Sequence, residues 1–484
     1  MIQNESEKLI LHHQHAYGLI ESNHQDLEEC DKTSELDKNE EHKEESHVKS
    51  IGMLGSVAIA VNSLAGPAIL QLPATYQESG IIPTTVALVL VGTLSSLCSL
   101  HMANVVSQVP GNSSFNKDVE FSEPFRVFWG RRAFLMTQIL FFLCTVCLNV
   151  AAIVDTAEVV DTFLGHSSLG SIGIRFDKFE PQLVSWEHGP CSRKEVKQGL
   201  CEAFGDPSYG NFLLTAGYMI TAVVFIPACL MDLKENTSFQ IFGFFVLLII
   251  SSQFVISFIM YGLKFHHTPI WGINHAKMLG VIIFNFSLVL AIPAWLHEKK
   301  EKVSVSKVVN GSTIITTILY VTVGMGGALA IPSVNPNLLA PLVSGAFGTP
   351  LRIGASFFAF VIIGLDIPLF SVLTRYNLVN SGLCSKSLAN ILVVYIPWAL
   401  SWAFYQGNAI ADLLSWGGVF FTSAIAFILP LMLALYMLIK SKENQGTVNV
   451  YCGLIQSRYA KIISVFGLLV MAMLSVGYAI KGLL

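Results

Sequence analysis

The chain has 484 residues, of which 53% are hydrophobic and 13% are charged, and its mean hydropathy is +0.59. Because about a quarter of the residues of soluble proteins are charged, this composition excludes a soluble multidomain enzyme and indicates an integral membrane protein. The net charge of −4 combines −8 on residues 1–50, which hold 13 Asp or Glu and 5 Lys, with +4 on the remainder. Neither part has the basic stripe that is typical of nucleic-acid binding.

The first 50 residues differ from the rest of the chain. They contain no apolar run that could serve as a cleavable signal peptide, and their acidic, aromatic-poor composition predicts a disordered cytosolic tail. The stretch from Glu5 through Leu9 and Ile10 resembles the acidic dileucine signal that sorting adaptor proteins read on lysosomal and vacuolar cargo. We therefore expect an endolysosomal or vacuolar membrane, with the plasma membrane as the alternative.

After residue 50 the chain alternates between long apolar stretches and polar loops. A helix needs about 20 apolar residues to cross a hydrocarbon core of about 30 Å. The sequence therefore predicts an all-α polytopic protein embedded in the lipid bilayer, with about eleven transmembrane helices. The predicted spans are 51–75, 82–106, 134–160, 212–231, 238–262, 277–297, 308–331, 351–374, 388–404, 411–439 and 460–480.

The positive charges of the loops predict the orientation of these helices. If the tail is cytosolic, the loops on its side carry 14 Lys and Arg, and the short loops on the other side carry three. Because Lys and Arg accumulate on the cytosolic side, the N-terminus is predicted to be cytosolic and the C-terminus luminal or extracellular. The long loop 165–210 then lies outside, where Cys191 and Cys201 could either form a disulfide or remain free thiols.

Two of the apolar segments are interrupted in their interior. Gly66 and Pro67 lie near the middle of the first segment, and Pro293 lies at a similar depth in the sixth. Proline removes a backbone donor and disfavours a helical conformation of the residue before it. A simple kink explains either proline alone, but the matching positions favour an inverted-repeat transporter with its substrate near the midplane. At such interruptions the positive end of a half-helix can bind the carboxylate of a zwitterionic amino acid, and unwound carbonyl groups can bind its ammonium group.

The two interruptions form the predicted substrate site. In hydrocarbon, freed backbone groups are tolerated only where they are buried in protein or line a cavity. The site residues are Asn62, Ser63, Leu64, Ala65, Gly66, Pro67 and Ala68 of the first segment and Asn285, Phe286 and Ser287 of the sixth.

Three stretches resemble the amino acid/auxin permeases, a family within the amino acid, polyamine and organocation transporter superfamily. They are residues 66–73 (Gly-Pro-Ala-Ile-Leu-Gln-Leu-Pro), residues 292–307 at the exit of the sixth segment, and residues 414–430 of the tenth. The first stretch departs from the family pattern Gly-x-Gly-Ile-Leu-x-Leu-Pro, because Ala68 replaces the second glycine and Pro67 precedes it. The resemblance implies secondary active transport of amino acids.

The resemblance also implies the fold of the bacterial leucine transporter, with two inverted five-helix repeats plus one extra helix. Residues 51–262 would form the first repeat, including the loop 165–210, and residues 263–439 the second. Residues 440–484 would add an inner loop and the eleventh helix. Alternating access would then rock helices one, two, six and seven against the others around the substrate site.

The coupling ion depends on an acidic residue in the eighth segment. Sodium-coupled relatives in this family carry an Asn four residues before the first-segment glycine, which Asn62 matches, and a hydroxyl residue where Asp366 stands here. A carboxylate inside a membrane is costly and indicates a function. Proton coupling through Asp366 is our first hypothesis. The alternatives are a sodium ion bound by Asp366 with Asn62, Ser371 or Thr374, and a structural pairing of Asp366 with a polar neighbour.

A second acidic group, with Asp155, Glu158 and Asp161, stands near the outer end of the third segment. Asp155 and Glu158 are three residues apart and share a helix face. In an outer vestibule they could attract a cationic amino acid such as arginine or lysine. A solvated helix end without a function is the alternative.

Other classes of function have weaker support in the sequence. The chain has no His-Glu-x-x-His, Gly-x-Ser-x-Gly or phosphate-loop motif, so we predict no enzymatic activity, no metal site and no cofactor. An amino-acid sensor that signals through the 50-residue tail remains an alternative to a transporter.

Overall fold

The computed structural model describes residues 49–167, 170–177, 180–187, 203–204, 212–275, 277–334, 338–345, 347–405, 416–440 and 458–483. The sorting signal at Glu5, Leu9 and Ile10 and the cysteines Cys191 and Cys201 lie outside these residues, so the statements about them stay predictions.

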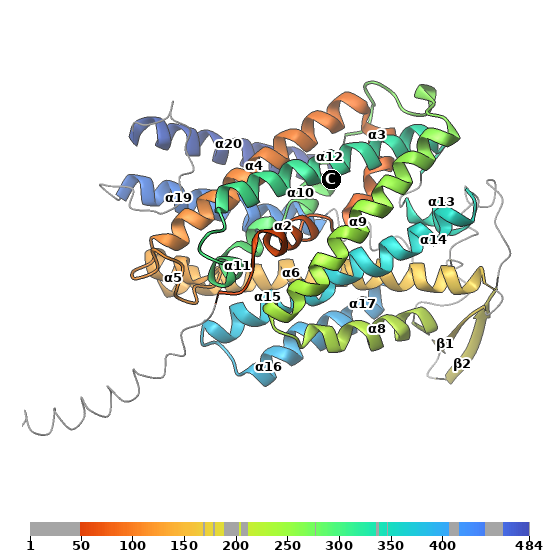
Figure 1. Ribbon diagram of the computed structural model, residues 1–484, viewed down its shortest axis with the longest axis horizontal. Coiled ribbons are helices and arrows are strands. Elements are labelled where there is room, and N and C mark those ends of the chain that lie inside the picture. Colours follow the sequence, from red (N-terminus) through yellow and green to blue (C-terminus); the bar gives the residue numbers. More distant parts are fainter. Residues whose placement is uncertain are drawn as a thin grey trace, which may run out of the picture. The chain divides into compact units, whose positions relative to one another are not determined.

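The first half of the chain is mostly helical (Figure 1). Gly80, with φ 94°, separates α3 from α4, and Gly130, with φ 87°, separates α5 from α6; this backbone conformation favours glycine. The elements are α2 (Met53–Asn62), η1 (Pro67–Gln71), α3 (Leu72–Ser79), α4 (Ile81–Ser107), α5 (Glu123–Trp129), α6 (Arg131–Gly165), α8 (Ala216–Cys229), α9 (Leu233–Tyr261) and η3 (Phe265–His267).

The second half of the chain is also helical. The elements α14, η5 and α15 form one continuous helix, Thr349–Asn380. The elements are α10 (Met278–Asn285), η4 (Leu288–Leu290), α11 (Ile292–Glu298), α12 (Val305–Ala330), α13 (Leu339–Val343), α14 (Thr349–Phe357), η5 (Phe358–Ile363), α15 (Gly364–Asn380), α16 (Lys386–Asn390), η6 (Ile391–Tyr395), α17 (Ile396–Phe404), η7 (Gly418–Ile428), α19 (Leu429–Lys440) and α20 (Arg458–Leu483).

The helices have the length and composition of membrane spans. Within the described residues, eight are long and apolar enough to cross a bilayer, and α2 and α8 are shorter apolar helices. Large apolar side chains are exposed on several of them, among them Val223, Ile249 and Ile318, as expected for faces that contact lipid. The predicted all-α polytopic membrane fold is confirmed, and the count of eleven spans stays a prediction.

The helices pack into two groups. In the first group α4 and α12 contact each other and the elements α2, α3, α10 and α11; in the second, α6, α8, α15 and α17 contact one another (Figure 1). Helix α9 contacts both groups, because it packs against α2, α12 and α15. The first group is formed by the segments predicted as helices one, two, six and seven.

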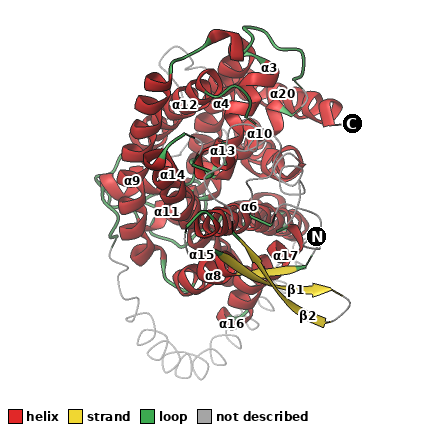
Figure 2. Ribbon diagram, turned by 90° about the vertical axis from the view of Figure 1, so that its right-hand side faces the viewer, coloured by secondary structure: helices red, strands yellow, loops and turns green. Residues whose placement is uncertain are grey.

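A small antiparallel sheet accompanies the helices, although the sequence predicts only a polar loop there. Strand β1 (Ser171–Asp177) pairs with β2 (Glu180–Trp186) on one side and with β3 (Leu213–Thr215) on the other. Figure 2 shows the hairpin of β1 and β2 beside α8 and α17. Strand β3 leads directly into α8, so the sheet joins the ends of these helices.

Two names are used below for the ends of the helical bundle. The Glu120 end is where Lys49, Glu120, Glu298 and Asn380 lie, and the Asp161 end is where Asp161, Thr215 and Tyr405 meet.

Candidate functional site

The first interruption occupies residues 63–66. Helix α2 ends at Asn62, a turn follows, and Gly66 has an extended backbone with φ −66° and ψ −179°. Pro67 then begins η1, because the first turn of a helix does not require the N–H that proline lacks. The predicted break near Gly66 is confirmed, and the proline follows the unwound residues.

The second interruption lies at Phe286 and Ser287. Their backbone angles, φ −98° and ψ 58° for Phe286 and φ −97° and ψ 14° for Ser287, depart from those of an α-helix. The short helix η4 follows, and Pro293 lies in the first turn of α11. This predicted break is also confirmed, with the unwound residues well before the proline.

Side-chain hydrogen bonds join the two interruptions. The Ser287 hydroxyl donates to the carbonyl oxygen of Ser63 at 3.2 Å, and the Ser95 hydroxyl on α4 donates to the carbonyl oxygen of Phe286 at 3.3 Å. Unwinding leaves such carbonyls without helical partners. The predicted substrate residues of the two segments therefore lie together and are buried. The side chain of Ala68 lies outside the described part of the chain.

Asp366 on α15 reaches the first interruption. A β-carbon placed on Gly66 would lie 3.5 Å from Oδ2 of Asp366. Asp366 is 1% exposed, and neither of its carboxylate oxygens has a hydrogen-bond partner among the described residues. Because an isolated buried anion is costly, this carboxylate requires a proton or a cation.

Asn62 is held by α9. Its amide nitrogen donates to the backbone carbonyl and to the side-chain oxygen of Gln240, both at 2.8 Å. Gln240 donates in turn to the carbonyl oxygen of Leu365, the residue before Asp366, at 3.2 Å. Gln240 is a functional candidate that the sequence patterns do not single out. Its only signal is its place as a polar residue within an apolar stretch.

The hydroxyls of Ser371 and Thr374 lie further along α15 and have other partners. Asn149 of α6 donates to the Ser371 hydroxyl at 3.1 Å, and the Thr374 hydroxyl donates to the carbonyl oxygen of Phe370 at 2.6 Å. Five residues correspond to about 140° around a helix, so Ser371 faces α6 while Asp366 faces Gly66. The structure therefore does not bring these hydroxyls together with Asp366.

The acidic group at the Asp161 end is buried, so its interpretation as a solvated helix end is wrong for two of its members. Asp155 is 3% exposed and Asp161 is 0% exposed, whereas Glu158 is partly exposed. Asp155 has no hydrogen-bond or ion-pair partner within the described ranges. Asp155 and Asp161 therefore have different environments although they share one helix.

Asp161 is a hydrogen-bonding centre for the Asp161 end of the bundle. It joins α6 to the sheet, to the start of α8 and to the end of α17, and each donor compensates part of the cost of its burial. Its carboxylate accepts hydrogen bonds from Ser171 Oγ at 2.5 Å, Gly217 N at 2.8 Å, Thr215 Oγ1 and Tyr405 Oη.

Arg375 is a buried cation, although the sequence places it in a loop. It is 1% exposed, donates to the carbonyl oxygens of Cys229, at 2.9 Å, and of Met231, and lies 3.5 Å from the carboxylate of Asp232. Carbonyls at a helix C-terminus lack hydrogen-bond donors within the helix, and the guanidinium group of Arg375 donates to them instead. It thereby fixes α15 to the turn between α8 and α9.

At the Glu120 end, a loop carboxyl is buried against α15. Asn380 donates to Glu120 at 2.9 Å, and two residues along the loop the Ser122 hydroxyl donates to Asn377 at 2.9 Å. Burial raises the pKa of Glu120 well above its usual range; the charge of Asp118 adds to the rise, and the hydrogen bond from Asn380 opposes it. The loop is thus fixed to α15 through a carboxyl that readily holds a proton.

The chain before α2 pairs with the chain after α11. Ile51 and Lys299 form a parallel β-bridge, in which the backbone N–H of Ile51 donates to Glu298 at 3.0 Å and that of Lys300 donates to Ile51 at 2.9 Å. The two interrupted helices are therefore joined at the Glu120 end as well as at their breaks.

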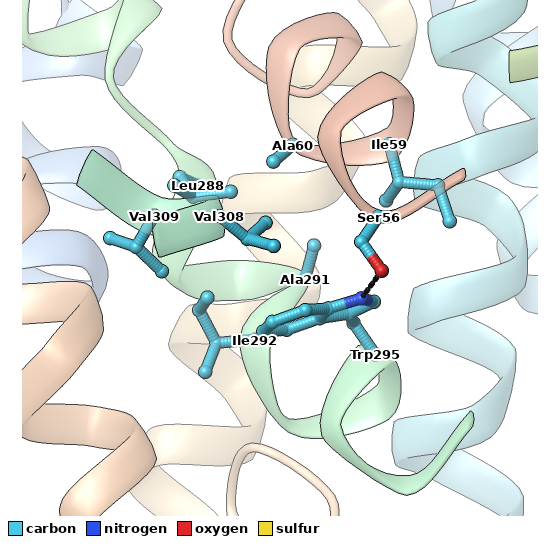
Figure 3. A pocket seen from close by; sticks show the side chains of 9 residues that line it. All are labelled: Ser56, Ile59, Ala60, Leu288, Ala291, Ile292, Trp295, Val308 and Val309. Atoms are coloured by element: carbon cyan, nitrogen blue, oxygen red, sulfur yellow. Dashed lines mark hydrogen bonds between the residues drawn. The ribbon is translucent and has the colours of Figure 1, made fainter. Parts of the chain in front are cut away.

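A small apolar pocket lies between the same two helices (Figure 3). Trp295 donates from Nε1 to the Ser56 hydroxyl at 2.9 Å across it, so this indole packs and bonds within the first group of helices. The almost wholly apolar lining does not suit a zwitterion. The pocket is lined by Ser56, Ile59, Ala60, Leu288, Ala291, Ile292, Trp295, Val308 and Val309.

Comparison with known proteins gives a likeness of fold. No protein-family model matches the chain, and no curated protein matches it. Among solved structures, the chain is similar to the manganese transporter of Eremococcus coleocola, with a TM-score of 0.54 and 14% identity over 89% of this chain and 87% of that one. Within the described residues, no group of three or more His, Cys, Asp or Glu could hold a metal ion. The chain therefore has the fold of a multi-pass membrane transporter.

Proposed function

We propose that the protein is a secondary active transporter of amino acids that is coupled to protons. Transport would proceed by alternating access around the two interrupted helices. The observation that carries the proposal is the carboxylate of Asp366, which is buried beside Gly66 without a hydrogen-bond partner in the described structure.

The position of Asp366 supports a coupling role. Asp366 belongs to the second group of helices, and Gly66 lies in a segment of the first group, so the carboxyl stands where the groups meet. Protonation removes its charge and thereby the cost of enclosing it between them. A proton would thus favour the closed arrangement, and its release would favour opening.

A proton is favoured over sodium as the coupling ion, because most of the other proposed sodium ligands already have hydrogen-bond partners. The hydroxyls of Ser371 and Thr374 bond elsewhere, so of the three proposed partner ligands only Asn62 has an unpartnered side-chain oxygen. Sodium requires a shell of hard oxygen ligands, and fewer of these stand beside Asp366 than the sodium hypothesis needs. The structural hypothesis requires a polar partner for Asp366, and none is present among the described residues.

The amino acid substrate is supported by the chemistry of the interruptions. Unwound backbone at both breaks offers polar groups within the bundle, and carbonyls there already accept bonds from Ser287 and Ser95. A carboxylate and an ammonium group need partners of this kind. The resemblance of residues 66–73 to amino acid/auxin permeases agrees with it. An acidic organelle lumen would supply the proton gradient.

Transport by purified full-length protein in proteoliposomes tests the proposal. We expect radiolabelled amino acid to accumulate when a pH gradient is imposed, with no change when sodium is replaced. Asp366→Asn should abolish accumulation and retain exchange of labelled for unlabelled substrate, because the site remains intact. Full pH-driven accumulation by Asp366→Asn would overturn the proton hypothesis. A sensor without transport would show no flux, and deletion of residues 1–48 separates signalling from transport.

A further inference from the structure

Asp155 is a buried carboxylate that the proton-coupling step does not use, and its direction follows from its neighbours on α6. Gly217 of α8 packs against Ala157 and Asp161, so these two residues mark the face of α6 that meets α8. Two residues differ by about 200° around a helix, so Asp155 lies about 160° from Ala157. Its side chain therefore leaves α6 on the side turned away from α8.

That side of α6 contacts elements of the proposed substrate site. Cys144 stands eleven residues before Asp155, only about 20° away around the helix, and its thiol lies 3.6 Å from the Thr422 hydroxyl of η7. Helix α6 also contacts η1, the segment that follows Gly66. Asp155 thus lies on the same side of α6 as Cys144, the residue that contacts η7.

The depth of Asp155 along the bundle follows from two hydrogen bonds of α6. Asn149 bonds to Ser371, and Thr156 donates to the carbonyl oxygen of Ala359 at 3.4 Å. Residues 149–156 of α6 therefore run beside residues 359–371, the stretch that contains Asp366 (Figure 1). Asp155 precedes Thr156, so it lies near the level of Ala359, between one and two helical turns from Asp366 toward the Asp161 end.

Most of the unpartnered side-chain atoms of this region are hydrogen-bond acceptors. In the amides of Asn62, Asn149 and Asn285 the nitrogen is already engaged, so the free atom is the oxygen. The Tyr320 hydroxyl, also unpartnered, has a single proton to offer. Among the buried unpartnered atoms of the described structure are the acceptors Asn62 Oδ1, Asn149 Oδ1, Asn285 Oδ1 and both oxygens of Asp366.

We propose that the transported amino acid has a cationic side chain, an ammonium or guanidinium group, and that Asp155 binds it. This inference rests on the proposed transport of amino acids. A neutral amino acid would leave the carboxylate of Asp155 buried and unpaired, which is unfavourable. A guanidinium or ammonium group neutralises the charge and brings several N–H donors to a region where acceptors are in excess.

The test compares arginine with citrulline, which has a similar shape but no charge. Uptake is measured in proteoliposomes under one imposed pH gradient for the wild type, Asp155→Asn and Asp155→Glu. Glu187→Gln is the matched control, because it removes the same charge from an exposed residue after β2. Thermal unfolding in detergent shows whether each variant is folded.

We expect the wild type to prefer arginine over citrulline by at least about tenfold in kcat/KM. Asp155→Asn should lose this preference by lowering arginine uptake while citrulline uptake stays similar, Asp155→Glu should restore part of it, and Glu187→Gln should keep it. Equal uptake of both by the wild type, or an unchanged preference in folded Asp155→Asn, would overturn the inference and leave proton-coupled transport standing.

Two further outcomes separate this inference from the proposed function. If no amino acid is transported under any gradient, both fail. If Mn²⁺ uptake, measured with the metal alone, depends on Asp155 and arginine uptake does not, the carboxylate binds a metal ion and the inference is overturned.

Discussion

Trp295 of α11 donates a 2.9 Å hydrogen bond to the Ser56 hydroxyl of α2, and this bond spans the two interrupted helices beside their apolar pocket. Ser56 is buried, and its hydroxyl also donates to the carbonyl oxygen of Gly52 at 2.8 Å. The two half-helices on this side of the breaks are thus joined by side chains as well as by backbone.

The first prediction concerns this bond. Ser56→Ala should lower the free energy of unfolding by about 1 kcal/mol, because it leaves the buried indole N–H without an acceptor. Trp295→Phe should cost more, since it also removes buried volume. The double variant should show a coupling energy of about 1 kcal/mol in denaturant unfolding in detergent. Ser252→Ala, on an exposed part of α9, is the control and should change stability by less than about 0.5 kcal/mol. Additive effects of the two substitutions would contradict the coupling.

The second prediction tests the contact between Gly66 and Asp366. Gly66 has a backbone conformation that alanine adopts freely, and the added methyl group would lie 3.5 Å from Asp366. Gly66→Ala should therefore fold normally while its methyl group shields the carboxylate. We expect pH-driven uptake to fall about tenfold, which corresponds to about 1.4 kcal/mol.

Gly467→Ala is the control for this experiment, because a β-carbon at Gly467 meets no atom within 4 Å. It should leave uptake unchanged. Wild-type uptake by Gly66→Ala would mean that access to Asp366 does not pass beside Gly66.

The interruptions and the buried acid could be predicted from the sequence because each depends on local chemistry. Proline and glycine disturb a helix wherever they stand, and Asp366 stands out within an apolar segment. The partners of these residues could not be predicted, because Gln240 lies 178 positions from Asn62 and only the packing of α9 brings them together. The burial of Asp155 and Arg375 could not be predicted for the same reason. The sheet could not be predicted either, because its strands pair across a long loop.

The third prediction is a pH dependence of stability at the Glu120 end. Because the pKa of Glu120 is raised in the folded state, the folded protein holds this proton more tightly than the unfolded chain. Its contribution to stability is complete below the unfolded pKa of about 4.3 and is lost as pH rises through the folded pKa. Glu120→Gln should remove this loss, so its Tm should fall less than that of the wild type between about pH 5 and pH 8.

Asp118→Asn provides a second arm of the same measurement. Removing the charge of Asp118 removes part of the rise in the pKa of Glu120, so the loss of stability should be smaller and should be complete at a lower pH. Identical pH profiles for the wild type and Glu120→Gln would show that the carboxyl does not hold a proton there.

The fourth prediction concerns the hydrogen-bonding centre at Asp161. Asp161→Asn replaces one acceptor oxygen by an NH2 group that faces donors, and it should destabilise the protein by about 3 kcal/mol. Tyr405→Phe removes a single donor and should cost about 1 kcal/mol. Equilibrium unfolding in detergent measures both, and equal small effects would contradict a shared centre.

The pairing of Ile51 with Lys299 has a mechanical consequence. It connects two half-helices that are more than 200 positions apart in the chain. Lys49, which donates a hydrogen bond to the carbonyl oxygen of Ser114, directly precedes this connection. A pull on the chain before Lys49 therefore acts on both half-helices at once. In the proposed transport cycle, a protein bound to that segment would therefore act on both interrupted helices.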